Sequence, residues 1–518
     1  MCRHCKVDSQ NVIDPRDFSH INRLWHPDDF VIDTHVNKRE DEARFRRMSH
    51  HRMHNVFHQH EFGENPNNIH FATPGELLHM HQLGVAKRSI ESISQLVGPG
   101  HNAEFETIAQ KLGGGLSRNS DRRFPRSRFG TNNNVLNPNM KEGKDYAGML
   151  LCLLLALLTP KGRAASKLTP NKIRDQVGFI EFLLGMEEFL KHGVMTLSRI
   201  DKLRKTMLHF LKLIKEHCKR KGGNGNKLIK NHLYLHLPDY IQRWGPPSGW
   251  DSAPSESHHK TEIKGPSKNT QRNSSTLIRQ TWKRKREKHI LKRVSMIYSN
   301  DEVEDTSSSQ HLESNQNKKL RGTQGRIFLN NGSPSMQWTR VENHSKSVYP
   351  TEVVYFCTEH ILPLVVDDHI IVRTEHHRHG VIFRASPSYL HDSGQDSCIW
   401  YDWAIFKIDG SPIPCQILCF IRIGSLRPGI DHAVQQYPVT ENDNFAVVRR
   451  MTSPPYKKFK SDYVTCGKLS EELYLFDCET TVSDVAVVHE EGGPDNSFMV
   501  VANRDRWLNV FQQFIDKQ

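Results

Sequence analysis

The chain has 518 residues, of which 36% are hydrophobic, and carries a formal net charge of +13 at pH 7. It is long enough for several domains and at least one large core, and its low hydrophobic content predicts that part of it is loosely ordered. Ten scattered cysteines and no recognisable signal peptide argue against a disulfide scaffold and favour a reducing compartment, the cytosol or the nucleus.

Changes in composition and periodicity divide the chain into seven segments that mix helical and strand-like patterns. They are a Cys/His-rich segment (1–60), a strand–turn–helix segment (61–98), a mostly helical segment (99–226), a histidine pair followed by a basic stretch (227–293), a disordered linker (294–345), a small β-domain (346–428) and a mixed α/β region (429–518). This succession predicts an α+β multidomain protein.

Two short motifs near the N-terminus carry candidate chemistry. Cys2 and Cys5 form a C-x-x-C pair, which is half of a common zinc ligand set. Residues 69–73 are strand-like, and apolar spacing then predicts a helix from Glu76 to about Leu96. A carboxylate at the end of a strand can hold a metal ion, but a glutamate in the first turn of a helix is also favoured by the helix dipole alone.

Helical spacing predicts helices over 173–192 and 196–219. The apolar run 147–158 is twelve residues long. A bilayer-spanning helix needs about 20 residues, so this run predicts a buried helix and no membrane association. Glycine and asparagine clusters predict a loop with short helices over 98–145. That range includes Gly113-Gly-Gly115, which lacks the Lys-Ser/Thr of a phosphate-binding loop.

The densest group of candidate site residues lies between 227 and 256. His232 and His236 are four residues apart, so both imidazoles would share one face of a helix or a strand and could supply half of a structural zinc site. Two histidines without metal are the simpler alternative. Glu256 follows His236 by twenty residues. A carboxylate there could hold Mg²⁺ beside a phosphodiester, or it is an ordinary glutamate at a helix start.

The most basic part of the protein follows Glu256. Residues 257–293 contain twelve Lys or Arg and two Glu, which favours a phosphate-backbone partner over a solvated tail. Four cations at four-residue intervals would line one face, although Pro266 prevents one uninterrupted helix, and the next four resemble a nuclear-import cluster. The predicted DNA-binding residues are Lys260, Lys264, Lys268, Arg272, Lys283, Arg284, Lys285 and Arg286.

Beyond the linker, short strand-like runs predict a small antiparallel barrel or sandwich within 346–428. The runs are 353–357, 369–374, 380–383, 398–408 and 414–423. Residues 429–518 mix helical and strand-like patterns and predict no particular fold.

Together these motifs resemble a family of DNA transposases. They are the C-x-x-C pair, Ile69-His-Phe-Ala-Thr-Pro-Gly-Glu-Leu-Leu-His79, a long helical insertion, His-x-x-x-His-x-Pro ending at Pro238, and Glu256-Ser257. This order is similar to that of the RNase H-like transposases of the CACTA/Plavaka group, relatives of the catalytic subunit of the V(D)J recombinase. The resemblance covers about residues 1–290, and Trp400-Tyr-Asp-Trp403 resembles the accessory C-terminal region of these proteins.

The resemblance implies a partial RNase H-like core interrupted by a long α-helical insertion, with a small C-terminal β-barrel-like domain. It implies DNA strand cleavage and transfer with Mg²⁺ or Mn²⁺ held by carboxylates, a structural Zn²⁺, and a nuclear location. Carried over by position, the catalytic carboxylates are Glu76 and Glu256, and the zinc ligands are Cys2, Cys5, His232 and His236. The partners would be transposon-end and target DNA and, by analogy with dimeric relatives, a second copy. No small-molecule substrate is expected.

Three departures from the family pattern bear on activity. The first catalytic aspartate should precede the C-x-x-C segment, and Asp33 is the one strand-like substitute. Glu76 stands where aspartate is usual, and Cys2 and Cys5 precede the second carboxylate instead of following it. We therefore expect an N-terminally truncated transposase without strand-transfer activity. The alternatives are a non-catalytic, transposase-derived DNA- or chromatin-binding protein, and a basic zinc-stabilised protein with another partner.

Overall fold

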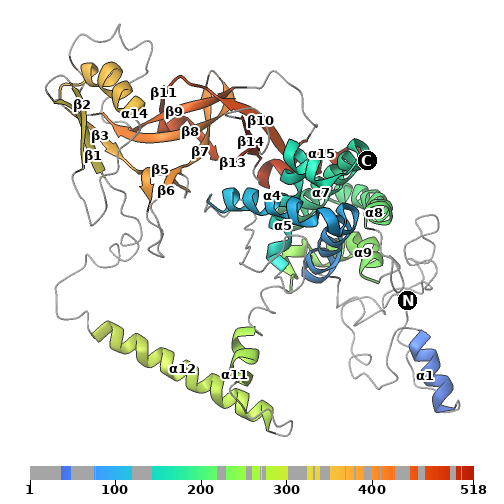
Figure 1. The fold of residues 1–518 in the computed structure, drawn as a ribbon. Coiled ribbons are helices and arrows are strands. Elements are labelled where there is room, and N and C mark those ends of the chain that lie inside the picture. The colour runs from blue at the N-terminus through green and yellow to red at the C-terminus, as the bar shows by residue number, and fades with distance from the viewer. Residues whose placement is uncertain are drawn as a thin grey trace.

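The structure of the protein is a computed structural model. It describes residues 37–47, 75, 77–118, 143–218, 229–252, 260–268, 270, 276–301, 324–330, 333–338, 351–367, 369–378, 381–389, 398–408, 410–423, 425, 427, 444–452, 461–490, 497–502 and 504–518. Over these ranges the chain forms twelve α-helices and a curled antiparallel sheet, which confirms the mixed α and β class. A helical body and a sheet region lie side by side (Figure 1). The predicted strand 69–73 is outside these ranges, so the RNase H-like core stays a prediction.

The helical body surrounds one apolar helix. Its elements are the π-helix η4 (Leu78–Ala86), α3 (Lys87–Val97), α4 (Pro99–Arg118), α5 (Gly143–Leu158), α6 (Pro160–Ser166), α7 (Pro170–His192), α8 (Leu197–His217), α9 (Ile229–Trp244), the 3₁₀ turn η5 (Pro247–Gly249) and α15 (Arg504–Asp516). The apolar side chains of α5 from Tyr146 to Leu158 are all buried, as predicted for this run. In the described part of the chain no single helix is long and apolar enough to cross a membrane. Helices α5 and α6 reach that length only jointly, across a 96° bend.

Threonines fix where the helices of this body begin. The Thr159 hydroxyl accepts a hydrogen bond from the backbone N–H of Gly162 at 3.0 Å, and the Thr196 hydroxyl accepts one from Arg199 at 3.3 Å. Each bond satisfies a donor that the first turn leaves unpaired. Helices α7 and α8 coincide closely with the two helices predicted over 173–192 and 196–219.

The loop predicted for 98–145 is wrong in its first part. Helix α4 runs through Gly113-Gly-Gly115 to Arg118. Phe105, Ile108 and Leu112 recur at helical spacing and are buried in the main core. This burial outweighs the roughly 1 kcal/mol that each glycine costs in a helix.

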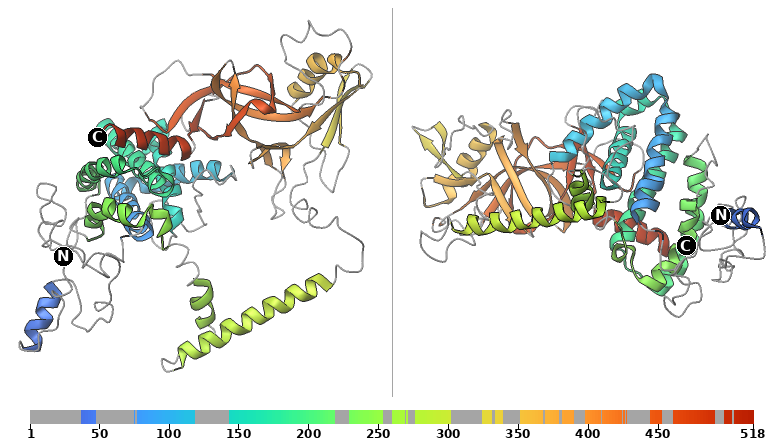
Figure 2. Two further views of the ribbon diagram at one scale, coloured as in Figure 1. Left: turned by 180° about the vertical axis from the view of Figure 1, so that it is seen from behind. Right: turned by 90° about the horizontal axis from the view of Figure 1, so that it is seen from below.

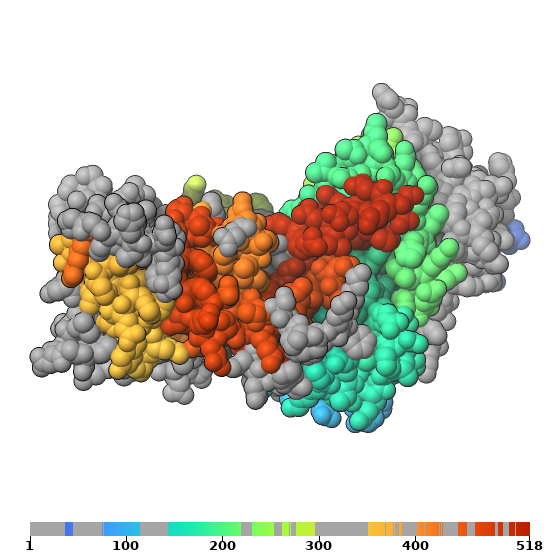
Figure 3. Space-filling view, turned by 90° about the horizontal axis from the view of Figure 1, so that it is seen from above, coloured from blue at the N-terminus to red at the C-terminus, as the bar shows by residue number. Residues whose placement is uncertain are grey.

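The C-terminal helix α15 closes the helical body. Trp507, Phe511 and Ile515 recur at four-residue intervals and are buried, and this face packs against α7 and α8. Gly185 on α7 permits the close approach, because a Cβ at that position would lie 3.0 Å from the Phe511 Cβ of α15 and would also overlap the Tyr463 hydroxyl. Figure 3 shows α15 lying across the helical body beside the strands of the sheet.

The larger sheet is built around the long strand β8. Its strands are β1 (Gln324–Asn330), β2 (Ser333–Trp338), β3 (His369–Arg373), β7 (Trp403–Ile408), β8 (Ser411–Arg422), β9 (Asn444–Thr452), β10 (Val464–Leu469), β11 (Tyr474–Asp477), β12 (Thr481–Asp484), β13 (Ala486–His489) and β14 (Ser497–Val501). β8 pairs with β7, β3 and β9, and its register against β9 shifts between Ile417 and Cys419. Such a bulge bends a strand and increases its twist, which favours the curl of the sheet.

Smaller elements complete the C-terminal half and the remaining described segments. A second, three-stranded sheet contains β4 (Glu375–Arg378), β5 (Val381–Tyr389) and β6 (Cys398–Tyr401). The short helices are α1 (Lys38–Arg47), α14 (Thr351–Phe356), the π-helix η7 (Cys357–Ile361), and the 3₁₀ turns η8 (Leu362–Leu364) and η10 (Cys478–Thr480).

Three predictions for the C-terminal half differ from the structure. The linker predicted at 294–345 contains the end of a long helix and the hairpin β1–β2, which pairs with β3. Residues 353–357 are helical because their buried side chains do not alternate as those of a half-exposed strand would. The division at 428 does not interrupt the sheet: β9 pairs with β8, and β10, β13 and β14 contribute to the core of the helical body.

A pair of basic helices extends away from both parts of the molecule (Figures 1 and 2). The π-helix η6 (Lys260–Lys264) continues directly into α11 (Gly265–Lys268), and α12 (Leu277–Asp301) packs against both. These turns do not form one uninterrupted α-helix, as predicted, because the π-helix η6 changes to α11 just before Pro266. A proline has no backbone N–H to donate within a helix. The π-helical turn of η6, which is wider than an α-helical turn, comes directly before Pro266.

Candidate functional site

The predicted histidine pair lies on α9 and is buried. The side chains of His232 and His236 face each other with ring centroids 5.0 Å apart, and their Nε2 atoms are 3.1 Å apart. The four-residue spacing thus places both imidazoles on one face, and the face is helical. Arg88 on α3 donates a hydrogen bond to the side chain of Asn231 at 3.1 Å, which ties the first turn of α9 to α3.

The separation of the two Nε2 atoms fits two ligands of one zinc ion. Zinc–nitrogen bonds are about 2.0–2.1 Å, so two nitrogens of a tetrahedral site lie about 3.3 Å apart. The observed 3.1 Å is close to this value, and it is also the distance of a hydrogen bond between two histidines without metal. Among the described residues no group of three or more His, Cys, Asp or Glu side chains is arranged to hold a metal ion. The other predicted ligands, Cys2 and Cys5, lie outside those residues.

The segment that carries Glu76 packs against α9, although Glu76 itself lies outside the described residues. Gly75 is buried, and a Cβ on it would come within 2.5 Å of the Met80 sulfur and 3.1 Å of Leu233 Cδ1. Leu77 is 2% exposed. The residues on both sides of Glu76 are therefore held in the core, and Leu233 is the neighbour of His232 in α9.

The segment that leads toward Glu256 also packs on α9. The Trp250 indole donates a hydrogen bond to the Gly245 carbonyl at 3.1 Å, and its ring meets that of Tyr240 at 6.3 Å. Glu256 lies outside the described residues, as does Asp33. The flanks of Glu76 and the segment around Trp250 thus both contact the helix that carries the histidine pair.

The predicted DNA-binding residues divide between the two members of the basic helix pair. α12 contains eight Lys or Arg against two acidic residues, and Glu262 of η6 holds it through contacts of 3.4 Å to Lys285 and to His289. Lys264, Lys268, Lys283, Arg284 and Arg286 are exposed, and Lys285 is half-buried. The backbone of Lys260 begins η6, and Arg272 lies outside the described ranges.

Helix α12 also carries exposed apolar side chains. Ile278 is 85% exposed and Trp282 is 65% exposed. The ammonium of Lys285 lies 5.6 Å from the centre of the Trp282 ring. A helix with this composition lies isolated from both cores, so its surface is available for a large anionic partner.

A buried polar network was missed by the sequence analysis. Glu187 on α7 accepts hydrogen bonds from Lys191 at 2.5 Å and from the Gln82 amide at 2.8 Å. Its other oxygen lies 3.8 Å from His81 Nε2, and His81 Nδ1 lies 3.1 Å from the Tyr234 hydroxyl. The sequence hint was Glu187 four residues before Lys191 in the apolar second half of α7, whereas the Gln82 partner is 105 residues away and has no local signal.

The charges in this network follow from burial and pairing. Burial opposes the charge of Glu187, but the charge interactions with Lys191 and His81 and the hydrogen bonds from Lys191 and Gln82 outweigh it, and the pKa of Glu187 falls to about 2. Burial lowers the pKa of His81 below its ordinary value. The network therefore links η4, α7 and α9 through one charged pair and a histidine that burial keeps neutral.

Comparisons with known protein families, with curated proteins and with solved structures found no match to this chain.

Proposed function

We propose that this chain is a DNA-binding protein of transposase descent, which contacts the phosphate backbone through its basic helix pair. The observation that carries the proposal is α12, with six more cationic than acidic side chains on one extended helix. Its 25 residues correspond to a length of about 37 Å at 1.5 Å per residue. That length spans about one turn of duplex DNA, which repeats every ~34–36 Å.

The transposase part of the proposal rests on the motif order and on the packing around α9. An RNase H-like core would hold Glu76 and Glu256 near one another, and the described flanks of both segments contact α9. Their carboxylates would hold Mg²⁺ or Mn²⁺, which would activate water or a hydroxyl against a phosphodiester. A nuclear location and a second copy as partner belong to the same proposal. The non-catalytic, chromatin-binding alternative keeps the helix pair without the metal chemistry.

Binding of the full chain to duplex DNA should depend steeply on salt. Each neutralised phosphate releases counterions, so six to ten contacts lower the affinity roughly 10³–10⁵-fold between 50 and 200 mM salt. Fluorescence anisotropy with a labelled duplex of arbitrary sequence would measure the slope. A basic protein with some other partner would show weak binding that changes little with salt.

The variant Glu256→Ala distinguishes a catalytic transposase from the non-catalytic DNA- or chromatin-binding alternative. It should leave the DNA affinity unchanged, because Glu256 does not belong to the basic helices. With Mg²⁺ present, we expect no strand transfer from either protein. Nicking by the original chain that disappears in Glu256→Ala would show that the catalytic site is active.

We further propose that His232 and His236 supply two ligands of a structural zinc ion, with Cys2 and Cys5 as the expected second pair. Protein purified from zinc-supplemented cells should contain about one zinc per chain. His232→Ala and His236→Ala should each lose it, because a tetrahedral site cannot spare a ligand. The exposed His101→Ala is the matched control. Native mass spectrometry measures the stoichiometry, and a metal-free original chain would refute the site.

A further inference from the structure

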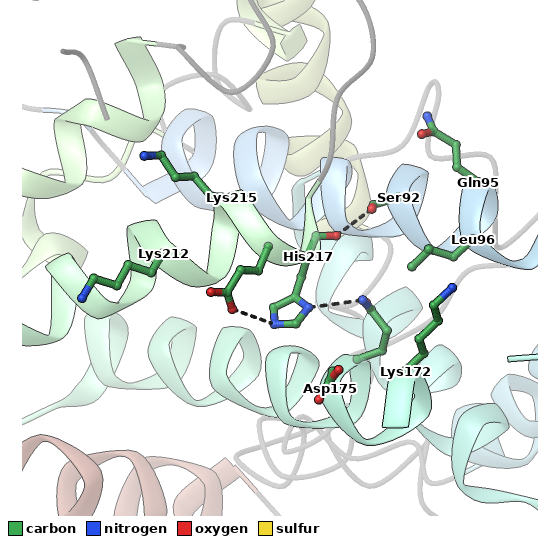
Figure 4. Close-up of a pocket in the computed structure, with 10 residues that line it drawn as sticks. Ser92, Gln95, Leu96, Lys172, Asp175, Lys212, Lys215 and His217 are labelled. Atoms are coloured by element: carbon green, nitrogen blue, oxygen red, sulfur yellow. Dashed lines mark hydrogen bonds and ion pairs between the residues drawn. The ribbon is translucent and has the colours of Figure 1, made fainter. Parts of the chain in front are cut away.

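A cleft of about 810 Å³ opens between α3, α7 and α8 in the helical body. Lys212, Lys215 and His217 line it from the C-terminal end of α8, and Lys172 lines it from the start of α7. Figure 4 shows His217 at the centre, with Lys212 and Lys215 to one side and Lys172 to the other. This cleft is formed by elements other than the basic helix pair.

The three lysines of this cleft differ from neighbouring cations on the same helices. On α8, Arg199 pairs with Asp516 at 3.0 Å and Arg204 pairs with Asp239 at 2.6 Å. Within the described part of the chain, no ion pair joins the lysines of the cleft to a carboxylate; these are Lys172, Lys212 and Lys215. All three are exposed, so their ammonium groups are available to an anion from solution.

His217 is held in place at the floor of the same cleft. Its ring packs on Phe179 with centroids 5.1 Å apart, and its Nδ1 lies 3.5 Å from the Gln176 amide nitrogen. The Ser92 hydroxyl donates a hydrogen bond to the backbone carbonyl of His217 at 2.6 Å. These contacts fix the imidazole between the lysines.

Two carboxylates also line the cleft and limit its positive charge. Glu216 lies 3.8 Å from His217 Nε2. Asp175 is exposed on α7. Counting histidine as neutral, the three ammonium groups against two carboxylates leave a surplus of one positive charge, and three flexible ammonium groups suit the several oxygens of a phosphate better than a single carboxylate.

We propose that this cleft binds phosphate groups through Lys172, Lys212 and Lys215. The phosphates belong either to the DNA backbone, in which case the inference rests on the proposed function, or to a soluble phosphate compound. In the first case the cleft adds a contact to DNA beyond the basic helix pair. In the second it is an anion site independent of DNA.

The test removes the three charges without touching the core. The full-length variant with Lys172→Gln, Lys212→Gln and Lys215→Gln is compared with a control that carries Lys161→Gln, Lys407→Gln and Lys517→Gln. The control lysines are also exposed and line other surfaces. Titration calorimetry with inorganic pyrophosphate and anisotropy with duplex DNA are measured for both, and circular dichroism checks the fold.

We expect the cleft variant to lose pyrophosphate binding. If the ligand is DNA, its DNA affinity falls at least ~10-fold at 0.1 M salt and its salt slope decreases by about 2–3, since each lost contact contributes about 0.9. Loss of pyrophosphate binding with unchanged DNA affinity identifies a soluble phosphate compound. Equal behaviour of both variants overturns the proposal. Should the original chain bind no DNA, the pyrophosphate titration still decides whether the cleft is a phosphate site.

Discussion

Replacing Lys283, Arg284, Lys285 and Arg286 by glutamine should weaken DNA binding by roughly 10²–10³-fold at 0.1 M salt. If each cation neutralises one phosphate, the slope of log affinity against log salt should decrease by about 3.6. The reason lies in α12, whose charges stand on an extended helix; Lys283 and Arg286 are exposed, and the ion pairs of Arg284 with Glu287 and of Lys285 with Glu262 are solvent-accessible and can exchange for phosphates. Anisotropy across a salt series measures the affinity and the slope together.

The control must show whether the loss of DNA affinity depends on where the four cations lie or only on the total charge removed. Lys161, Lys407, Lys517 and Lys111 supply four cations outside α12, and glutamine at all four removes the same total charge. We expect a much smaller change in slope for this control. Similar losses of DNA affinity in both variants would mean that binding depends only on the net charge of the protein. The proposal that α12 contacts the DNA would then be wrong.

Substituting Glu187 by alanine should lower the free energy of unfolding by about 1–3 kcal/mol, because the Gln82 amide loses its buried acceptor, while Lys191, whose side chain is 23% exposed, can reach solvent. The change leaves Lys191 without its carboxylate and removes the acceptor of the Gln82 amide. Urea unfolding followed by circular dichroism would measure it. The exposed Asp201→Ala, whose side chain is 80% exposed, should stay within about 0.5 kcal/mol.

A double variant tests whether charge or packing causes this loss. Glu187→Leu combined with Lys191→Met replaces the pair by apolar side chains of similar volume. Such replacements of buried ion pairs are often neutral, so most of the stability should return. If the double variant is as unstable as Glu187→Ala, the network acts through its hydrogen-bond geometry and not through its charges.

The stability from Glu187 should also depend on pH. Its pKa is about 2 in the folded chain against an ordinary value of 4.5, so the unfolded chain binds more protons between these values. The contribution is complete above about pH 4.5 and is lost as the pH falls toward 2. The difference in free energy of unfolding between the original chain and Glu187→Ala should decrease as the pH falls from 4.5 toward 2. His81, with its lowered pKa, adds a loss that begins as the pH falls below 6.5.

Local periodicity predicted the helical body better than the sheet region. Helices α7 and α8 follow from residues that recur every three or four positions, because one face of each must be buried. The run at 353–357 carries apolar residues that suit either structure, and its burial pattern became clear only in the tertiary fold. Pairing of β9 with β8 joins segments that no local pattern connects.

Local sequence patterns also predicted only part of the candidate site. A spacing of four residues placed His232 and His236 on one face but did not choose between helix and strand, whereas the structure places them on α9 with their nitrogens 3.1 Å apart. The network around Glu187 and the cleft around His217 bring together helices far apart in the sequence. Their residues are ordinary in local context, so only the fold identifies them.

The packing of α15 has a consequence for folding during synthesis of the chain. Trp507 and Ile515 share one core with Leu77 and the helices up to α9. At 5–20 residues per second, α15 leaves the ribosome on the order of 10–50 s after α9. During that interval Phe182 and Phe189 lack the ring of Phe511 that later packs on them. These apolar rings of the helical body therefore stay uncovered until the final helix is made.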